Sequence, residues 1–456
     1  MIPIQVKLRD TIQKSNLPPS QVLVLGFGAV ILLGSILLSL PIACVNGKSI
    51  GYINALFTST SAVCVTGLSV VDTGTYWTLF GQIVIILLIQ IGGLGFMTMA
   101  TMISFLVGKR ISLRSRLIMQ EALGQFDISG IVRLTRYILL VTFMIEGLGA
   151  FLLSFRFIPE YGRAKGIFYS IFHSISAFCN AGFDVIGDGR SLTPYVGDPL
   201  VNFVIMALVV IGGIGFAVII DVAKTRKFKK LSLNSKIVLS TTAALLGIGF
   251  ILVFAFEFFN PATLGSLSFG DKILAAMFHA MTPRTAGFNT LPMEDLTLST
   301  KFITMVFMFI GGSPGSTAGG IKTTTVALVV LTMISVTKGR QETEVFSRRI
   351  NKDAVNRALA VLGIAAVIIV CVIMIMTLTE SAHSFEDIVF ETISAFGTVG
   401  LTVGLTPKLS VMGKIIIAIS MFVGRLGPLT IVFALARKQA KRKALIRYPE
   451  GKVMIG

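Results

Sequence analysis

The chain has 456 residues, of which 54% are hydrophobic and 14% are charged, and its mean hydropathy is +0.85. A soluble domain carries about 25% charged residues, so this composition excludes a soluble enzyme or binding domain and indicates an integral membrane protein. The formal net charge of +18 does not indicate nucleic-acid binding, because the basic residues lie on separate loops without aromatic residues between them.

Eight apolar runs are long enough to cross a bilayer as helices, which takes about 20 residues each. They lie near residues 21–42, 78–106, 134–157, 200–222, 237–258, 302–334, 358–379 and 411–436. The first run is too long for the core of a signal peptide, and no convincing small-residue cleavage site follows it. We therefore expect it to be retained as a membrane span.

Within each consecutive pair of runs, a weakly polar segment ending in a single Gly lies between the first run and the second. These segments are 57–68, 172–183, 278–288 and 390–401. The first, second and fourth follow the pattern Phe-x3-Ser-Ala-x4-Gly, whereas the third is one residue shorter and has Thr282-Pro283 in place of Ser-Ala. A single copy could be an ordinary turn. Four copies in matching positions predict re-entrant segments around one axis along the membrane normal.

The expected fold is therefore an all-α polytopic membrane protein with four pseudo-symmetric repeats, each a transmembrane helix, a re-entrant pore helix and a second transmembrane helix. The predicted divisions are a cytoplasmic N-terminus (1–20), repeat 1 (21–106), repeat 2 (107–224), repeat 3 (225–338), repeat 4 (339–437) and a cytoplasmic tail (438–456). Such an arrangement resembles a potassium channel with all four repeats in one chain.

Each Gly segment is expected to begin as a short helix and to return as an extended strand through its Gly. Carbonyl oxygens along such strands can replace the hydration shell of a monovalent cation, and Gly reaches the required backbone angles without a steric penalty. Residues 65–68 and 398–401 are most similar to the Thr-Val-Gly-Tyr-Gly filter of potassium channels, with the second Gly missing.

The second run of each repeat also carries a Gly at a matching place: Gly92, Gly212, Gly311 and Gly424. These residues could allow close helix packing. In repeat 3, however, residues 311–320 are too rich in Gly and Pro for an ordinary membrane helix, which predicts a flexible intramembrane loop below the Gly segments. Lys322 follows this loop, and Arg425 takes the second Gly position in repeat 4. A phosphate-binding loop is disfavoured, because Ile321 separates Gly320 from Lys322 and no strand precedes the motif.

Loop charges predict the orientation in the membrane. The regions 1–20, 106–136, 224–236, 338–357 and 437–456 hold 28 basic and 7 acidic residues, whereas 43–76, 156–200, 257–301 and 380–414 hold 10 basic and 13 acidic residues. Since basic loops remain on the cytoplasmic side, both termini are predicted to be cytoplasmic.

Several ionisable residues lie within or near the apolar runs or the Gly segments. Glu146 lies in mid-span, where helix packing is the alternative to a functional role, and Asp221 lies one turn before Lys224, where local pairing is expected. Arg284, beside the third Gly segment, is expected to pair with Glu294 or Asp295. No cluster of His, Cys and carboxylates near the polar segments suggests an enzyme or a metal centre.

The chain resembles the Trk/Ktr/HKT superfamily of potassium transporters, and within it the membrane subunits of the bacterial Ktr type. The similar runs are 72–74, 90–97, 282–289, 390–402 and 446–451. The resemblance implies a potassium-translocating subunit in the bacterial cell membrane that forms a homodimer with one pore per protomer. It also implies a cytoplasmic ring of RCK/KTN-type regulatory subunits that bind a nucleotide. This chain itself would bind K+, and whether it also binds Na+ is left open by the resemblance.

The same resemblance assigns residues to roles. The filter would consist of Val65, Thr66, Gly67, Asn180, Ala181, Gly182, Thr285, Ala286, Gly287, Thr398, Val399 and Gly400. The gate would consist of Gly311, Gly312, Ser313, Pro314, Gly315, Ser316, Thr317, Ala318, Gly319 and Gly320, with Lys322 and Arg425. Asn180-Ala181 and Thr285-Ala286 depart from Thr-Val, which leaves the sharpness of selection against Na+ open. A strictly coupled Na+/K+ or H+/K+ symporter is the alternative function, with Glu146 and Asp221 as coupling candidates.

Overall fold

The computed structural model describes residues 18–106, 111, 113–122, 130–340 and 342–435. Most of the predicted N-terminal segment and the whole predicted tail, including the run 446–451, lie outside these residues. The described chain folds into helices and one short antiparallel hairpin, β1 (Glu344–Val345) with β2 (Arg348–Arg349). The prediction of an all-helical membrane fold is confirmed at this level.

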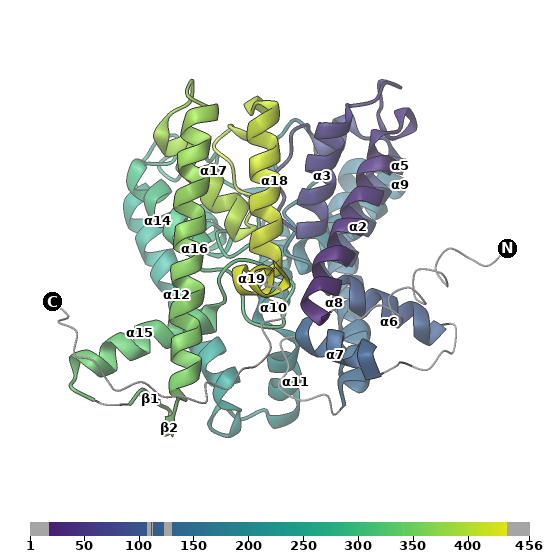
Figure 1. Cartoon of the computed structure of the whole chain (residues 1–456). Helices are drawn as coiled ribbons and strands as arrows, with labels where there is room; N and C mark the ends of the chain where they lie inside the picture. The colour runs from purple at the N-terminus through teal and green to yellow at the C-terminus, as the bar shows by residue number, and fades with distance from the viewer. Residues whose placement is uncertain (1–17, 107–110, 112, 123–129, 341, 436–456) are drawn as a thin grey trace.

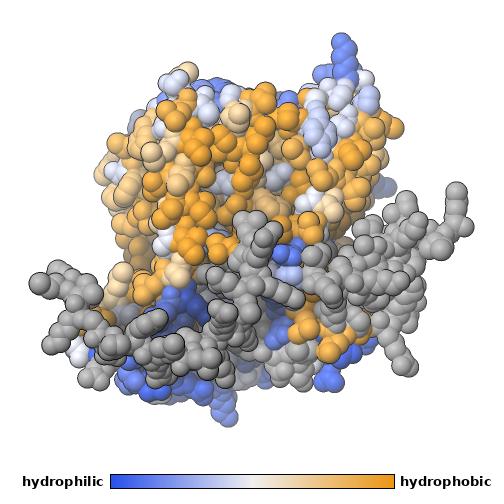
Figure 2. All heavy atoms as spheres, in the orientation of Figure 1, coloured by the Kyte–Doolittle hydropathy of each residue, from blue (hydrophilic) through white to orange (hydrophobic). Residues whose placement is uncertain are grey.

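The first helix of each repeat is long, apolar and continuous. These helices are α2 (Pro19–Ser39), α8 (Ile131–Tyr161), α12 (Leu233–Glu257) and α16 (Lys352–Thr379), and each is long enough to cross a membrane. Large apolar side chains on them are exposed, including Leu33, Phe155, Ile251 and Met374 at 60% or more. Figure 2 shows hydrophobic residues over the middle and upper part of one face, with hydrophilic residues at its lower edge. Such an apolar belt suits lipid contact.

A shorter helix packs against the first helix of each repeat. These helices are α3 (Tyr52–Cys64), α9 (Arg163–Phe178), α13 (Phe269–Met281) and α17 (Phe385–Gly397). The first residue of the repeated pattern anchors each of them, since Phe57, Phe172, Phe278 and Phe390 are at most 1% exposed. Inside a membrane protein such rings stabilise the fold through close van der Waals packing, so the pattern's Phe is explained by packing.

The second run of each repeat is broken into two helices, whereas the sequence had predicted a continuous span in repeats 1, 2 and 4. The pairs are α5 (Leu79–Leu94) with α6 (Phe96–Leu106), α10 (Pro199–Ile214) with α11 (Phe216–Thr225), α14 (Leu298–Phe309) with α15 (Thr323–Thr337), and α18 (Val411–Leu426) with α19 (Pro428–Leu435). The bend between α10 and α11 is 98°. Figure 1 shows α6 and α15 running sideways from the lower end of the bundle.

One Gly produces the break in three of the four repeats. Gly95, Gly215 and Gly427 have φ of 79°, 99° and 84°, with ψ of 137°, 135° and 138°. A residue with a side chain rarely adopts these angles, so Gly is required there. In repeat 3 a whole loop replaces the break. By length and apolarity, the described residues contain four single spans and one bent pair, so the count of eight spans stays a prediction.

The remaining helices are short connections. They are α4 (Thr73–Tyr76), α7 (Leu113–Ala122) and the 3-10 turns η1 (Pro41–Ala43), η2 (Thr193–Tyr195), η3 (Phe228–Lys230) and η4 (Thr406–Lys408).

Candidate functional site

The four Gly segments (65–68, 180–183, 285–288 and 398–401) meet in a ring. A Cβ atom placed on Gly67 would lie 2.5 Å from the carbonyl oxygen of Ala181, one on Gly182 would lie 2.8 Å from that of Ala286, and one on Gly287 would lie 2.7 Å from that of Val399. A Cβ atom on Gly400 would collide with the carbonyl oxygen of Thr66, which closes the ring. Each Gly thus abuts the peptide that precedes the next Gly, and a side chain there has no room.

The same backbone turn precedes each of these glycines. The residue two positions earlier is left-handed in every repeat, with φ of 57° at Val65, 59° at Asn180, 64° at Thr285 and 51° at Thr398. Left-handed β-branched residues are strained by about 1–3 kcal/mol and persist only where the surroundings impose the conformation. The strain identifies this turn as a constrained place in the fold.

The Ser of the repeated pattern holds each Gly segment. The carbonyl oxygens of Ser61, Ser176 and Ser394 accept hydrogen bonds at 2.8 Å from the N–H before the Gly of their own repeat, and the Thr282 carbonyl does the same at 3.0 Å. The hydroxyls of Ser61 and Ser394 accept from the N–H of Gly67 and Gly400 at 3.1 and 3.2 Å. The pattern therefore encodes a tether between the short helix and the strand that follows it.

The matching glycines of the second helices make close packing possible. A Cβ atom on Gly92, Gly212 or Gly424 would overlap the carbonyl oxygen of Val63, Phe178 or Phe396, which is four residues before the ring Gly in each case. Gly311 instead contacts the carbonyl of Gly319 in its own loop. Gly92, Gly212 and Gly424 thus allow the second helices to pack closely against the backbone just before the Gly segments. Close helix packing was the alternative predicted for these glycines.

The 311–320 loop is tied together at its base. Ile310 and Ile321 form a parallel bridge, the N–H of Gly311 donates to the Ile321 carbonyl at 2.9 Å, and the N–H of Thr323 donates to the Gly312 carbonyl at 3.0 Å. The hydroxyls of Ser313 and Thr323 lie 3.0 Å apart and share a hydrogen bond. The loop is therefore a compact excursion with a closed neck, rather than an extended linker.

The loop lies against repeat 2, where the carbonyl oxygens at the end of the broken helix accept hydrogen bonds from it. Residues at the end of α10 have no intrahelical donor beyond the break. The Gly213 carbonyl accepts from the N–H of Ser313 at 2.9 Å, and the Gly212 carbonyl accepts from that of Thr317 at 3.3 Å. In return, the N–H of Phe216 donates to the Gly315 carbonyl at 3.0 Å. The break between α10 and α11 is thus part of the loop's binding surface.

Two basic side chains reach the loop. Lys322 precedes α15 and donates from Nζ to the Ala318 carbonyl at 2.8 Å. Arg425 donates to the Thr317 carbonyl and to the carbonyls of Gly92 and Gly93 at the end of α5, the last at 3.2 Å. A cation at the C-terminal end of a helix is favourable. Arg425 therefore joins the loop of repeat 3 to repeats 1 and 4.

The loop also contacts two of the Gly segments directly, which the sequence did not indicate. The hydroxyl of Thr317 lies 2.9 Å from Asn180 Oδ1 and 3.1 Å from the Phe178 carbonyl. On the opposite side, a Cβ atom on Gly319 would collide with the Thr398 hydroxyl. Only the tertiary structure brings these residues together, since they are separated by up to 139 positions.

Glu146 and Asp221 each accept hydrogen bonds from a neighbouring element. Glu146 is 4% exposed and accepts from Gln90 Nε2 at 3.1 and 3.3 Å. Asp221 accepts from Ser232 N–H at 3.0 Å and from the Ser235 hydroxyl at 2.5 Å, so it joins α11 to the start of α12 and forms no ion pair with Lys224.

The prediction for Arg284 was wrong. Among the described residues it pairs with neither Glu294 nor Asp295, and its Nη2 donates to the Thr242 hydroxyl on α12 at 3.3 Å. Its side chain is 7% exposed, and the contact with Thr242 places its guanidinium against α12. No group of three or more His, Cys, Asp or Glu residues in the described chain could hold a metal ion.

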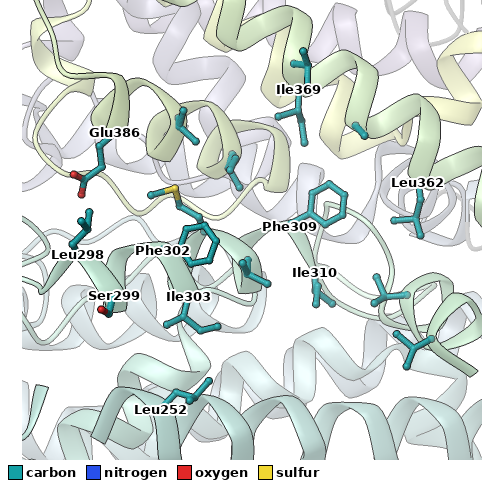
Figure 3. A pocket seen from close by; sticks show the side chains of 18 of the residues that line it. Leu252, Leu298, Ser299, Phe302, Ile303, Phe309, Ile310, Leu362, Ile369 and Glu386 are labelled. Atoms are coloured by element: carbon teal, nitrogen blue, oxygen red, sulfur yellow. The ribbon is translucent and has the colours of Figure 1, made fainter. Parts of the chain in front are cut away.

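A hollow lies at the side of the bundle, between repeats 3 and 4. It has a volume of about 1210 Å³, and residues of α12, α14, α15, α16 and α17 line it. Figure 3 shows the apolar side chains of Phe302, Phe309 and Ile369 around it, with Ser299 and Glu386 at one end. This lining offers a cation almost no ligands, so the hollow is not a path for ions.

Comparisons with known proteins agree with this architecture. The model of the TrkH family, described as cation transport protein, matches residues 18–444. Ktr system potassium uptake protein B of Bacillus subtilis is 49% identical over 96% of this chain and 97% of its own. Potassium/sodium uptake protein NtpJ of Enterococcus hirae is 43% identical over 97% and 98%.

The fold has a solved counterpart. The crystal structure of the potassium transporter TrkH from Vibrio parahaemolyticus matches with a TM-score of 0.72 and 18% identity, over 93% of this chain and 86% of that one. The likeness shows a shared fold. Taken with the family match and the relatives, it shows that this chain is a multi-pass membrane protein that belongs to the TrkH family of cation transport proteins.

Proposed function

We propose that this chain is the potassium-translocating membrane subunit of a bacterial K+ uptake system, conducting ions through the ring of the four Gly segments. The observation that carries the proposal is the cyclic contact of Gly67, Gly182, Gly287 and Gly400, each against the peptide before the next. The relatives named as Ktr system potassium uptake proteins B and D, at 37–49% identity, support the choice of ion.

In this proposal the peptide carbonyls before each ring Gly act as ligands. The residues are Val65 and Thr66, Asn180 and Ala181, Thr285 and Ala286, and Thr398 and Val399. K+ would exchange its hydration shell for these oxygens. The short helices α3, α9, α13 and α17 end directly before the ring, and the partial negative charge at a helix C-terminus favours a cation there. The protein supplies a fixed polar environment, and membrane potential supplies the driving force.

Flux into liposomes tests the proposal. Purified protein should carry K+ inward under an imposed inside-negative potential when no Na+ is present, and K+ should be preferred to Na+. Absence of K+ flux at every potential would overturn the channel-like mechanism. Flux that appears only with Na+ would favour the strictly coupled symporter, an alternative that the name of the relative NtpJ, a potassium/sodium uptake protein, supports.

We further infer that the 311–320 loop is the gate of this pore, with Lys322 and Arg425 as parts of it. The support is its position: it bonds to α10, contacts Asn180 and Thr398, and reaches α5 through Arg425. Deleting residues 312–319 should raise flux in the absence of any partner. A deletion variant that folds and conducts no faster than the parent chain would remove the loop from this role.

The proposed partners follow from the family resemblance. They are a second copy of this chain and a cytoplasmic nucleotide-binding ring of RCK/KTN type, with both termini of this chain on the cytoplasmic side. The name "Ktr system" of the relatives supports a multi-component assembly. Copurification with a soluble regulatory subunit, together with ligand-dependent flux, tests the ring. Cysteine accessibility at residues near each terminus tests the orientation.

A further inference from the structure

We propose that the side chain of Asn180 is a latch that holds the 311–320 loop in place through the hydroxyl of Thr317. This inference rests on the gating role proposed above and assigns part of the gate to a side chain of the second Gly segment. It also gives a reason for Asn at a position where the other repeats have Val65, Thr285 and Thr398.

The geometry of Asn180 allows its backbone to form part of the ring while its side chain contacts the loop. Its backbone has the same left-handed conformation as its three counterparts, with φ of 59°, and Asn is one of the few residues with a side chain that adopts this region readily. The side chain at this position can therefore differ from those of the other repeats without changing the backbone of the ring. It is 1% exposed and points away from the ring toward α10 and the loop.

Both ends of the amide are engaged. Nδ2 donates to the Val209 carbonyl on α10 at 3.3 Å, which sets the orientation of the group, and Oδ1 accepts from the Thr317 hydroxyl at 2.9 Å. Among the described residues, the Thr317 hydroxyl is the donor to Asn180 Oδ1. When the loop moves away, this buried amide oxygen loses its partner, and such a loss disfavours the open state.

Thr317 is the point of the loop where contacts with repeats 2 and 4 meet. Its N–H donates to the Gly212 carbonyl, its hydroxyl lies within reach of Asn180 and Phe178, and its carbonyl accepts from Arg425. The residue is fully buried. The hydroxyl has one hydrogen for two acceptors, so loss of the Asn180 side chain leaves the Phe178 carbonyl as a weaker substitute partner.

The counterparts of Asn180 do not make this contact. The hydroxyls of Thr285 and Thr398 are buried and have no hydrogen-bond partner in the described structure, and Val65 has no polar atom in its side chain. Thr398 only packs against Gly319. The hydrogen bond between a Gly segment and the loop is thus specific to repeat 2, which is why the latch is assigned to Asn180.

Flux measurements on substituted full-length protein in liposomes test the latch. Asn180→Gly removes the side chain without straining the left-handed backbone, Thr317→Val removes the hydroxyl and keeps the shape, and Thr317→Ser keeps the hydroxyl. One hydrogen bond changes an equilibrium about two- to tenfold. Thr317→Val should therefore raise K+ flux about two- to tenfold, Asn180→Gly somewhat less, and Thr317→Ser should stay near the parent value.

The double variant gives the decisive comparison. If both substitutions break the same bond, Asn180→Gly with Thr317→Val should conduct no faster than Thr317→Val alone. Thr142→Val is the matched control, because Thr142 on α8 is a buried hydroxyl without a partner in the described structure, and it should leave flux unchanged. The ratio of K+ to Na+ flux should be preserved in Thr317→Val, since the ring itself is untouched.

Other outcomes would overturn the latch. These are multiplying effects in the double variant, equal opening by Thr317→Ser and Thr317→Val, or loss of ion discrimination without higher K+ flux in Asn180→Gly. The deletion of 312–319 separates the two proposals: if it raises flux and the point variants do not, the gate stands and the latch falls, and if it does not, both fall. Should Asn180→Gly fail to fold, the two Thr317 variants decide the matter.

Discussion

The guanidinium of Arg425 donates a hydrogen bond to the backbone carbonyl of Thr317, across 108 positions of sequence. The same side chain satisfies carbonyls at the end of α5, where the helix breaks and its last carbonyls lack intrahelical donors. One residue of repeat 4 therefore holds a loop of repeat 3 against a helix of repeat 1. This relationship distinguishes a geometric role for Arg425 from a purely electrostatic one.

Substitution of Arg425 separates these two roles. Lys keeps the charge but cannot donate to several carbonyls from a planar fork. If the hydrogen bonds hold the loop, both Arg425→Lys and Arg425→Ala should raise K+ flux. If a fixed charge alone limits cations, only Arg425→Ala should do so. Lys414→Ala is the matched control on the same helix, because Lys414 Nζ bonds to Asn54 Oδ1 at 3.0 Å, away from the loop.

The ring glycines should not tolerate a side chain. Gly67 and Gly400 have φ of 95° and 93°, where other residues are strained by about 1–3 kcal/mol, and an added Cβ atom would strike a neighbouring segment. Gly67→Ser and Gly400→Ser should therefore lower the preference for K+ over Na+ or abolish K+ flux. Growth rescue at limiting K+ with Na+ competition measures this, with Gly28→Ala on α2 as control, since nothing lies within 4 Å of its Cβ position. Unchanged discrimination in both Ser variants would contradict the filter.

Two buried glutamates link the first and second helices of repeats 3 and 4. Glu257 accepts from the N–H and hydroxyl of Thr297 at 2.9 and 2.7 Å, and Glu380 accepts from the hydroxyl of Ser410 at 2.5 Å. Thr297 and Ser410 are the N-caps of α14 and α18. These contacts stabilise the helix starts, which are the supports of the ring.

Loss of either glutamate should lower stability rather than selectivity. Glu257→Ala would leave buried donors unpaired at a cost of about 1–3 kcal/mol, so the thermal midpoint in detergent should fall while the K+ to Na+ flux ratio of the folded fraction is kept. Glu386→Ala is the control, because Glu386 pairs with Lys301 at 3.6 Å and is partly exposed, where an ion pair contributes about 0–1 kcal/mol. Equal losses in the two variants would argue against the helix-start role.

Asp184, in the loop after the second Gly segment, is expected to make the stability of the protein depend on pH. Burial and the nearby Asp72 carboxylate raise the pKa of Asp184 to about 7, above the usual Asp value of about 3.9. The folded protein therefore binds this proton more tightly than the unfolded chain does, and stability from this group is lost as the pH rises from about 4 to about 7.

Asp184→Asn should therefore raise the thermal midpoint at pH 8 relative to the parent protein and change it little at pH 4. Asp188→Asn is the control, since Asp188 is exposed and pairs with Arg190 at 2.5 Å. A midpoint difference for Asp184→Asn that is the same at both pH values would show that the carboxyl does not titrate in this range.

Much of the fold class could be predicted from the sequence, because hydropathy and local pattern carry it. A helix in a bilayer needs a long apolar run, and Phe57 and Ser61 recur at fixed spacing because a buried ring and a tether to the next strand are local requirements. The four-copy spacing also identified the segments that the structure brings together. Their use as an ion filter stays a prediction.

The breaks of the second helices could not be predicted in the same way. Gly95, Gly215 and Gly427 are followed by further residues of apolar helices, so the hydropathy of each run is continuous across the break. A Gly in an apolar run is compatible with a helix. The positive φ at these positions is visible only in the structure, and of the three glycines only Gly215 has a close described neighbour, since a Cβ atom there would lie 2.7 Å from the Pro314 carbonyl oxygen.

By itself, the sequence determined the membrane class, the fourfold repeat and the positions that depart from the repeated pattern, such as the 311–320 loop and Arg425. Each of these depends on residues near one another along the chain. The tertiary structure alone decided what the exceptions contact: Arg425 meets the carbonyls of Thr317 and Gly92, and Asn180 meets the Thr317 hydroxyl. Hydrogen bonds between repeats depend on distances of about 3 Å, and no periodicity in one chain specifies which of many carbonyls or hydroxyls a distant side chain will reach.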